Sequence, residues 1–238
     1  MLQINDLDKR HGARTVLSGV TFQALPGRVT GFLGPNGAGK SSTLRILLGL
    51  DRPSSGTALI GGQAYRDLRD PIGTVGSMLD GSGAHRSRTA RNHLAWVARA
   101  GGIPKRRIPE VLEQTGLSEV SRTRVGTFSL GMGQRLGLAA ALLGQPATLV
   151  LDEPVNGLDP GGIRWMRSLL REHAGAGGTV LLSSHLMSEV AEIADDLVVI
   201  AGGRVVGSGP LEEVTAGYAT LEDAFFTLTR TAAAERRR

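Results

Sequence analysis

Short apolar stretches separated by glycine and proline indicate strands in the first sixty residues of the chain. Residues 29–33 predict a short buried strand, and residues 41–50 predict a helix directly after it. Further strands are predicted over residues 2–4, 16–25 and 57–60, with turns at residues 26–27 and 51–56. We expect these early strands to form an antiparallel layer.

The second half of the chain alternates predicted helices with apolar strands. Residues 147–151 are apolar apart from Thr148, which is typical of a strand buried on both faces. Asp159 followed by Pro160 supplies the cap and first-turn proline of a helix. The predicted helices cover residues 133–143, 160–173 and 187–194, and the predicted strands cover residues 179–183, 197–200 and 204–206, with a hairpin at Gly202 and Gly203. This alternation predicts an α/β fold with a mostly parallel sheet.

The middle of the chain, residues 80–124, has a helical pattern. Thr89 caps a first predicted helix, which ends at the glycines and proline of residues 101–104. A second predicted helix follows and stops near Gly116. We interpret this segment as a helical insertion and not as a linker. The sequence shows no low-complexity stretch and no internal repeat.

Composition narrows the classes of function. With 238 residues, the chain holds one sizeable domain, or a core with a subdomain. It has no cysteine, which excludes a disulfide scaffold, a thiol catalyst and a cysteine metal site. The first residues lack the pattern of a signal peptide, and no apolar stretch reaches the ~18 residues of a membrane span. We therefore expect a cytoplasmic protein that reaches a membrane only through another polypeptide.

The formal charge of +5 makes nucleic acid and anionic membrane surfaces candidate partners. The arginines look scattered along the sequence and aromatic residues are few, so the sequence indicates no platform for stacking bases. We expect no nucleic-acid partner. The basic run at residues 236–238 is typical of a solvated chain end.

The first candidate chemistry lies between the strand predicted at residues 29–33 and the helix after it. Residues 34–41, Gly-Pro-Asn-Gly-Ala-Gly-Lys-Ser, fit the P-loop pattern G-x-x-x-x-G-K-[ST] in the strand–loop–helix context that the pattern requires. The glycines let backbone N–H groups turn toward phosphate oxygens, and the helix N-terminus adds partial positive charge. Lys40 is predicted to reach the β- and γ-phosphates, and the Ser41 hydroxyl to bind Mg²⁺. The candidate nucleotide ligands are Gly34, Pro35, Asn36, Gly37, Ala38, Gly39, Lys40, Ser41 and Ser42.

Two acidic residues follow the apolar strand predicted at residues 147–151. An apolar strand that ends in Asp152 and Glu153 matches the Walker B pattern of P-loop proteins. Asp152 would hold Mg²⁺, directly or through water, and Glu153 would orient or deprotonate the water that attacks the γ-phosphate. The alternative is an acidic strand end in a turn.

A serine–glycine turn precedes the helix predicted at residues 133–143. Residues 127–135 read Thr-Phe-Ser-Leu-Gly-Met-Gly-Gln-Arg, and the backbone N–H groups at this helix start could bind a phosphate. Taken by itself, the segment is explained more simply by a plain helix cap.

The order of these features resembles the ATP-binding subunit of ABC transporters over nearly the whole chain. The P-loop, the helical insertion, the serine–glycine helix start, Asp-Glu-Pro at residues 152–154, Gly-Leu-Asp at residues 157–159 and a lone His185 follow in the order of that family. The resemblance implies a single ABC ATPase domain over residues 1–238. It also implies a P-loop NTPase core with an antiparallel layer, and a helical subdomain at residues 80–135.

The resemblance assigns roles outside the P-loop. Residues 128–132 occupy the position of the family signature Leu-Ser-Gly-Gly-Gln; Ser129 and Gly131 match it, whereas Leu130 and Met132 depart. In the family this signature covers the γ-phosphate of ATP held by the opposite subunit of a head-to-tail dimer. Residues 156–159, which end in Asp159, match the D-loop that meets its counterpart across the dimer. The implied catalytic residues are Lys40, Glu153 and His185, the last matching the switch histidine that contacts the γ-phosphate.

Two positions depart further from the family. By spacing, Asp80 stands where the family has a glutamine that touches Mg²⁺. An aspartate can still accept from metal-bound water, although an ordinary turn aspartate is an equal alternative. His11 stands where the family stacks an aromatic residue on adenine, and an imidazole offers less stacking area.

The resemblance implies an ATP hydrolase in which two copies bind ATP and Mg²⁺ at a shared interface and power a separate transmembrane permease from the cytoplasmic face. Residues 75–81, residues 88–94 and the signature look like those of stand-alone ATPases of bacterial exporters of drugs, antibiotics or lipids.

Three alternatives stay open: an importer ATPase, a soluble ABC ATPase acting on ribosomes or DNA, and a regulatory cassette with little hydrolysis. The importer shares every motif. Ribosome-acting members usually carry two cassettes and DNA-repair members carry long coiled coils, and this chain has neither. The intact Lys40, Asp152, Glu153 and His185 argue against the regulatory cassette.

Overall fold

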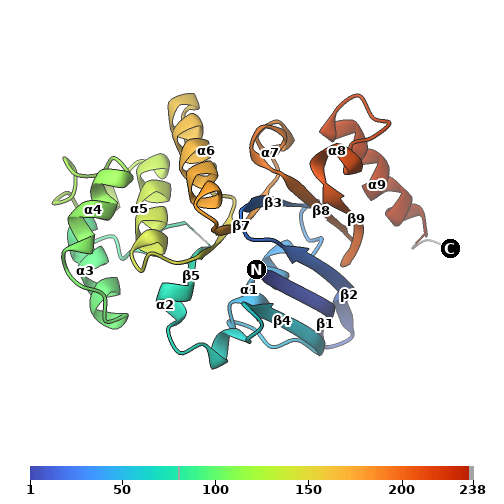
Figure 1. Cartoon of the computed structure of the whole chain (residues 1–238), viewed down its shortest axis with the longest axis horizontal. Coiled ribbons are helices and arrows are strands. Elements are labelled where there is room, and N and C mark those ends of the chain that lie inside the picture. Colours follow the sequence, from blue (N-terminus) through green and yellow to red (C-terminus); the bar gives the residue numbers. More distant parts are fainter. Residues whose placement is uncertain (80, 236–238) are drawn as a thin grey trace. The chain divides into compact units, whose positions relative to one another are not determined.

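The computed structural model describes residues 1–79 and 81–235, which divide into two compact units (Figure 1). The first unit comprises Met1–Arg69 and the chain from Leu170 onward, and the second comprises Asp70–Leu169. Asp80, the candidate Mg²⁺ ligand, lies outside the described residues.

The first unit begins with an antiparallel sheet in the order β2–β1–β4. Leu2 pairs with Ala24 on one side and with Ile60 on the other. These three side chains are buried, so the sheet presents an apolar face to the core. The sheet confirms the predicted antiparallel layer, and its strands are β1 (Leu2–His11), β2 (Arg14–Ala24) and β4 (Ser55–Ile60).

Strand β1 ends at His11, so the prediction that it stops at residue 4 was wrong. The pairing of β1 with β2 shifts register after Ile4, and Asp6 adopts a positive φ of 48°. A bulge of this kind moves the following side chains to the other face of the sheet. The apolar–polar alternation therefore breaks in the sequence although the strand continues.

The second sheet of this unit surrounds β3 (Arg28–Leu33). β3 lies between two parallel neighbours, β7 (Thr179–Ser184) and β8 (Asp196–Ala201), and β9 (Arg204–Pro210) pairs antiparallel with β8. Arg28 donates two hydrogen bonds to the Asp196 carboxylate, at 2.6 and 2.7 Å, and these bonds raise the pKa of Arg28. The Asp195 carboxylate accepts from the backbone N–H of Val29 at 2.8 Å. Both contacts fix the start of β3 against β8.

Helices follow the strands of this unit: α1 (Lys40–Leu47) follows β3, α7 (Met187–Ile193) follows β7, and α8 (Leu211–Val214) and α9 (Leu221–Glu235) come last. Helices α8 and α9 were not predicted from the sequence. Ala224 and Phe225 of α9 are buried, and the helix packs against β8 and α7. In the described ranges, no helix combines the length and apolarity needed to cross a membrane.

The second unit joins a parallel strand pair, β5 (Val75–Met78) and β6 (Thr148–Asp152), to a cluster of helices. The helices are α2 (Pro71–Thr74), α3 (Ala90–Ala100), α4 (Arg107–Gln114), α5 (Leu130–Leu142) and α6 (Pro160–Gly175), the last of which continues past the unit boundary. Leu94, Val111, Leu117 and Leu136 belong to the buried core of the cluster. Helices α3 and α4 confirm the two helices predicted in the middle of the chain.

Helix α5 begins at Leu130, so the predicted start at residue 133 was wrong. The Ser129 hydroxyl accepts from the backbone N–H of Met132 at 3.2 Å. This cap lets the helix begin three residues before the predicted start. Gly131 and Gly133 have low helix propensity, which hides this first turn in the sequence.

Candidate functional site

The P-loop, residues 34–41, connects β3 to α1 in the first unit. Gly37 and Gly39 have φ angles of 77° and 115°, in the region that side chains rarely adopt. An added Cβ would lie 2.4 Å from the Ile200 carbonyl oxygen at Gly34, and 2.4 Å from a methyl group of Leu17 at Gly39. Close packing therefore requires glycine at residue 34, backbone conformation requires it at residue 37, and both require it at residue 39.

Lys40 begins α1, and its side chain folds back over the loop. It is only 8% exposed, and its Nζ donates to the Gly34 carbonyl oxygen at 2.5 Å. Gly39 offers α1 no side-chain cap, so no side chain from that position covers the N–H groups of the first helical turn. A buried ammonium, a helix N-terminus and a glycine-rich backbone together provide the positive potential that a phosphate chain requires.

His185 follows β7 at the same sheet edge as the P-loop. Leu33 of β3 is paired with Ser184 of β7, so Gly34 and His185 both leave the carboxyl ends of adjacent parallel strands. The Ser184 hydroxyl accepts from the Leu186 N–H at 3.0 Å and defines the turn in which the exposed His185 lies. Ligands of open α/β sheets bind at this edge. The structure thus brings together two predicted residues that are far apart in the sequence.

His11 is exposed at the end of β1, where it is paired with Arg14 of β2. Two residues earlier, the buried Lys9 donates to the Asp51 carboxylate and to the Arg52 carbonyl oxygen, both at 2.6 Å. The hydrogen bond from Lys9 lowers the pKa of Asp51, and the nearby His11 acts in the same direction. This ion pair, which the sequence analysis missed, anchors the strand end that carries His11.

Asp152 is the last residue of β6 in the second unit and is half-buried, and Glu153 directly follows it. Glu153 has a positive φ of 51°. For a residue with a side chain this conformation costs roughly 1–2 kcal/mol, and such strain concentrates at functional sites. The Glu153 carbonyl oxygen accepts from the Asn156 N–H at 3.2 Å, which closes the turn into the D-loop segment. The strain favours a chemical role for Glu153 over an ordinary acidic turn.

Ser129 and Asp159 both cap helices of the second unit. The Asp159 carboxylate accepts from the Gly162 N–H at 2.6 Å at the start of α6, as Ser129 does for α5. The structure therefore confirms that Ser129 caps a helix. The same geometry leaves its hydroxyl at a helix N-terminus, where anions bind.

Gly131 and Gly157 bring the signature segment and the D-loop segment into contact within the second unit. A Cβ on Gly131 would lie 2.9 Å from the Gly157 carbonyl oxygen, and a Cβ on Gly157 would lie 2.3 Å from the Leu130 side chain. Leu130 is 66% exposed, yet it covers the α-carbon of Gly157. This contact was not predicted from the sequence; the available signal was a large apolar residue where the family has glycine.

The described residues contain no group of three or more His, Cys, Asp or Glu side chains arranged to hold a metal ion. Mg²⁺ needs no such cluster when it keeps several waters and binds one or two protein oxygens together with phosphate oxygens. Ser41 in the first unit and Asp152 in the second unit carry oxygens of the kind that Mg²⁺ prefers.

The ABC transporter family model matches residues 17–156 of the chain. The chain belongs to this family. It is 37% identical to the lantibiotic transport ATP-binding protein SrtF of Streptococcus pyogenes, over 94% of this chain and 96% of that protein. It is 39% identical to the bacitracin transport ATP-binding protein BcrA of Bacillus licheniformis, over 90% of this chain and 71% of that protein.

Solved structures agree with this assignment. An ATP-binding subunit of an ABC transporter superposes with a TM-score of 0.87 at 29% identity, covering 96% of this chain and 99% of that one. A dimeric ATP-binding cassette bound to ADP and Pi superposes with a TM-score of 0.78 at 23% identity, over 89% of this chain and 99% of that one; at this identity it bears on the fold alone. The chain is an ABC-type ATPase with the α/β cassette fold, and it binds nucleotide.

Proposed function

We propose that the chain is the ATPase subunit of a bacterial exporter that removes antibiotics or related molecules through a separate permease. The observation that carries this proposal is the similarity to SrtF, a lantibiotic transport protein, over 94% of this chain and 96% of that protein. The similarity to BcrA supports the same class of cargo. In this proposal residues 1–238 act as one ABC ATPase domain on the cytoplasmic face of the membrane.

The P-loop holds the phosphates of ATP, with Lys40 offsetting charge on the β- and γ-phosphates. Ser41 and Asp152 are the residues that would hold Mg²⁺, which supplies further neutralisation of phosphate charge when bound. Glu153 orients the attacking water and accepts its proton, and His185 contacts the γ-phosphate. The buried Lys40, the strained Glu153 and the position of His185 beside Gly34 support these roles.

Two copies of the chain form a head-to-tail dimer around two ATP molecules. Ser129 and Gly131, at the N-terminus of α5 in one copy, contact the γ-phosphate held by the P-loop of the other copy. Asp159 meets its counterpart across the dimer, and His11 stacks on adenine. Asp80 contributes an oxygen near Mg²⁺. Hydrolysis weakens the dimer, and its opening drives the permease.

The contact between Leu130 and Gly157 yields a prediction about ATP hydrolysis. We expect Gly157→Ala to lower both ATPase activity and the free energy of unfolding, because its Cβ would collide with Leu130. In a Leu130→Gly background the collision is absent. The loss in the free energy of unfolding caused by Gly157→Ala should therefore be smaller there by roughly 1–2 kcal/mol. A double-mutant cycle on phosphate release and on denaturant unfolding measures this difference.

Backbone strain at Gly157 is common to both backgrounds and cancels in the cycle. Gly102→Ala is the matched control, since Gly102 also lies in the second unit with a positive φ of 66°, and an added Cβ there meets nothing within 4 Å. If the two Gly157→Ala costs are equal, Leu130 does not restrain the D-loop segment.

The transport proposal is tested by finding the partner. A tagged Glu153→Gln chain, extracted from native membranes with ATP present, should co-purify with a protein that has several apolar spans of ~20 residues. The same preparation without ATP is the control. Inside-out vesicles that contain the unsubstituted chain and the recovered permease should accumulate a labelled antimicrobial peptide when ATP is added. Recovery of ribosomal proteins in place of a permease would overturn the proposal.

A further inference from the structure

The positive charge of the chain is concentrated in part of the second unit. Residues 81–151 contain ten Lys and Arg residues and three Asp and Glu residues. The rest of the chain contains 17 Lys and Arg residues and 19 Asp and Glu residues. Residues 81–109 contain seven basic residues and no acidic one. The net charge is therefore +7 in this segment and −2 elsewhere, so the interpretation of the arginines as scattered was wrong.

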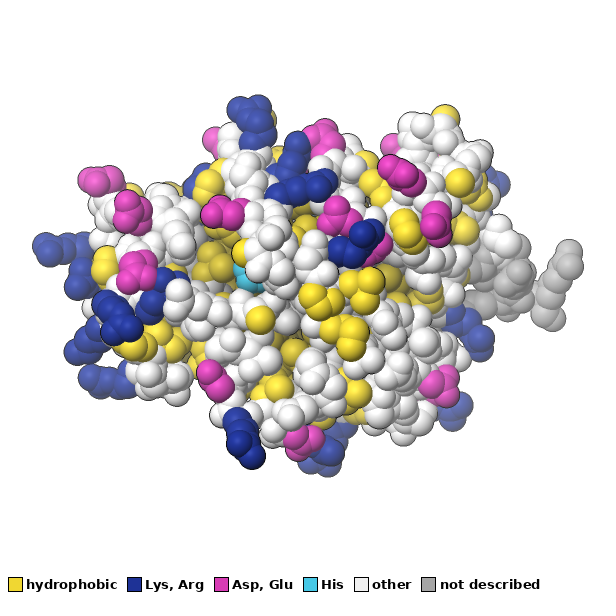
Figure 2. Space-filling view, viewed as in Figure 1, with side chains coloured by type: hydrophobic (Ala, Val, Ile, Leu, Met, Phe, Trp, Pro, Cys, Tyr) yellow, Lys and Arg dark blue, Asp and Glu magenta, His cyan; other side chains and the backbone are white. Residues whose placement is uncertain are grey.

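Backbone pairing gathers these charges around the start of α3. The N–H of Arg91 donates to the Ser121 carbonyl oxygen at 2.8 Å, and the N–H of Val125 donates to the Arg88 carbonyl oxygen at 2.9 Å. Residues 121–125 therefore run beside the first turn of α3. Figure 2 shows Lys and Arg side chains collected over this part of the molecule, at the left of the view. We call Arg86, Arg88, Arg91, Arg122 and Arg124 the arginine surface.

The charge of the arginine surface is not offset locally. Within the described part of the chain, none of its members forms an ion pair with a carboxylate. Of the three acidic residues in this segment, Glu110 is paired with Arg107. Burial, with a smaller contribution from Arg88, lowers the pKa of His93 inside α3, so this histidine is neutral at pH 7. The N-terminus of α3 adds partial positive charge of the same sign.

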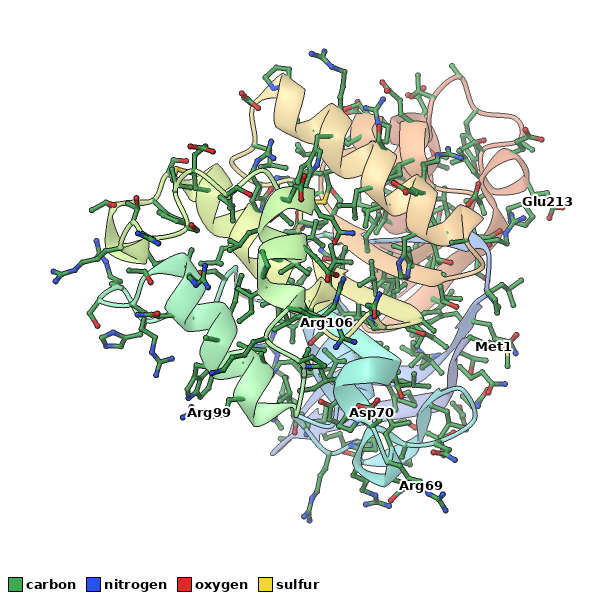
Figure 3. All side chains as sticks on the ribbon, turned by 60° about the vertical axis from the view of Figure 1, so that its left-hand side comes forward. Met1, Arg69, Asp70, Arg99, Arg106 and Glu213 are labelled. Carbon is green, nitrogen blue, oxygen red and sulfur yellow. The ribbon has the colours of Figure 1, made fainter. Side chains whose placement is uncertain are left out.

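An exposed tryptophan lies beside these arginines. Trp96 of α3 is 55% exposed, and the Arg88 guanidinium lies 4.7 Å from the centroid of its ring. Arg99, which Figure 3 labels near the end of α3, is exposed and extends the basic face beyond Trp96. Tryptophan is enriched at membrane–water interfaces, and Lys and Arg are in excess on the cytoplasmic side of membranes. No other exposed aromatic side chain occurs among the described residues of this unit, so stacking of successive nucleic-acid bases is not supported.

We propose that the arginine surface and Trp96 bind the anionic phospholipid headgroups of the membrane in which the permease lies. Guanidinium groups match phosphate oxygens in charge and in their paired hydrogen-bond geometry. Each basic residue near an anionic membrane surface raises the affinity about fivefold. The proposal rests on the proposed function only in that a transporter subunit works at a membrane.

Flotation with lipid vesicles tests this proposal without the permease. The full chain should bind vesicles of phosphatidylglycerol and phosphatidylcholine, and should not bind vesicles of phosphatidylcholine alone. The triple variant Arg86→Gln, Arg91→Gln and Arg122→Gln should bind the anionic vesicles about 100-fold more weakly. The matched control is Arg69→Gln, Arg204→Gln and Arg230→Gln, three exposed positions of the first unit that change the net charge equally. The control should keep most of the binding.

Equal losses in the two triple variants would overturn the proposal, because binding would then follow total charge and not this surface. Absence of binding to anionic vesicles would also overturn it. A third contrary result is that the Arg86, Arg91 and Arg122 triple variant no longer binds the permease in phosphatidylcholine vesicles, while its binding to anionic lipid is unchanged. The surface would then bind an acidic protein segment. Thermal unfolding of both triple variants, expected to match the unsubstituted chain, excludes misfolding. Failure here would leave the permease assays of the proposed function unaffected.

Discussion

Glu153→Gln is expected to lower ATP turnover by roughly 10²–10⁴-fold while ATP binding is retained. Glutamine keeps the size and hydrogen-bonding shape of the side chain but cannot accept a proton from water. Glu153 directly follows β6 and has a φ of 51°, so its backbone is fixed by the turn that its carbonyl oxygen closes with Asn156. The substitution should therefore remove the base without moving the loop. Phosphate release measures turnover, and a fluorescent ATP analogue measures binding.

The same variant should accumulate as a dimer in ATP, because the bound nucleotide is no longer cleaved. Size-exclusion chromatography with ATP and with ADP distinguishes this dimer from a permanent one. Glu172→Gln is the matched control, since Glu172 is exposed on α6 and its substitution removes the same charge. Turnover close to that of the unsubstituted chain would contradict the role of Glu153. A variant that neither turns over nor binds ATP would indicate a damaged fold.

The P-loop geometry could be predicted from the sequence because its pattern is contiguous. Gly34, Gly37 and Gly39 are needed where the backbone approaches Ile200 and Leu17 or takes a positive φ, and these requirements act over a few residues. The role of His185 was implied only by the resemblance to the ABC family, and its place beside the P-loop follows from the parallel pairing of β3 with β7. Parallel strands send the residues that follow them to one sheet edge, whatever their separation in the chain.

Contacts set by long-range register could not be predicted in this way. Lys9 meets Asp51 because β1 continues through a bulge that interrupts its apolar pattern. The arginine surface forms because residues 121–125 pair with the start of α3, a contact without any periodic signal. Leu130 covers Gly157 because two loops of the second unit converge. Each of these depends on tertiary structure that local propensity does not encode.

Lys40→Ala is expected to weaken ATP binding by about 10–100-fold, the loss of one to two charge-assisted hydrogen bonds to phosphate. The side chain is 8% exposed and its Nζ lies 2.5 Å from the Gly34 carbonyl oxygen, so the ammonium is held over the loop before any phosphate arrives. Its removal therefore costs both the charge and the preorganised position. Isothermal titration with ATP and with ADP measures the effect.

Arg45→Ala is the control for Lys40→Ala, because Arg45 is an exposed cation on the same helix, α1, and should leave nucleotide binding unchanged. Loss of a buried lysine that donates to Gly34 could also loosen the loop itself. A melting temperature measured without nucleotide separates these effects, since a weakened phosphate contact lowers only the stabilisation added by ATP. Nucleotide affinity equal to that of the unsubstituted chain would contradict the P-loop assignment. The proposed dimer would then need another source for the positive charge that we propose faces Ser129 and Gly131 of the second copy.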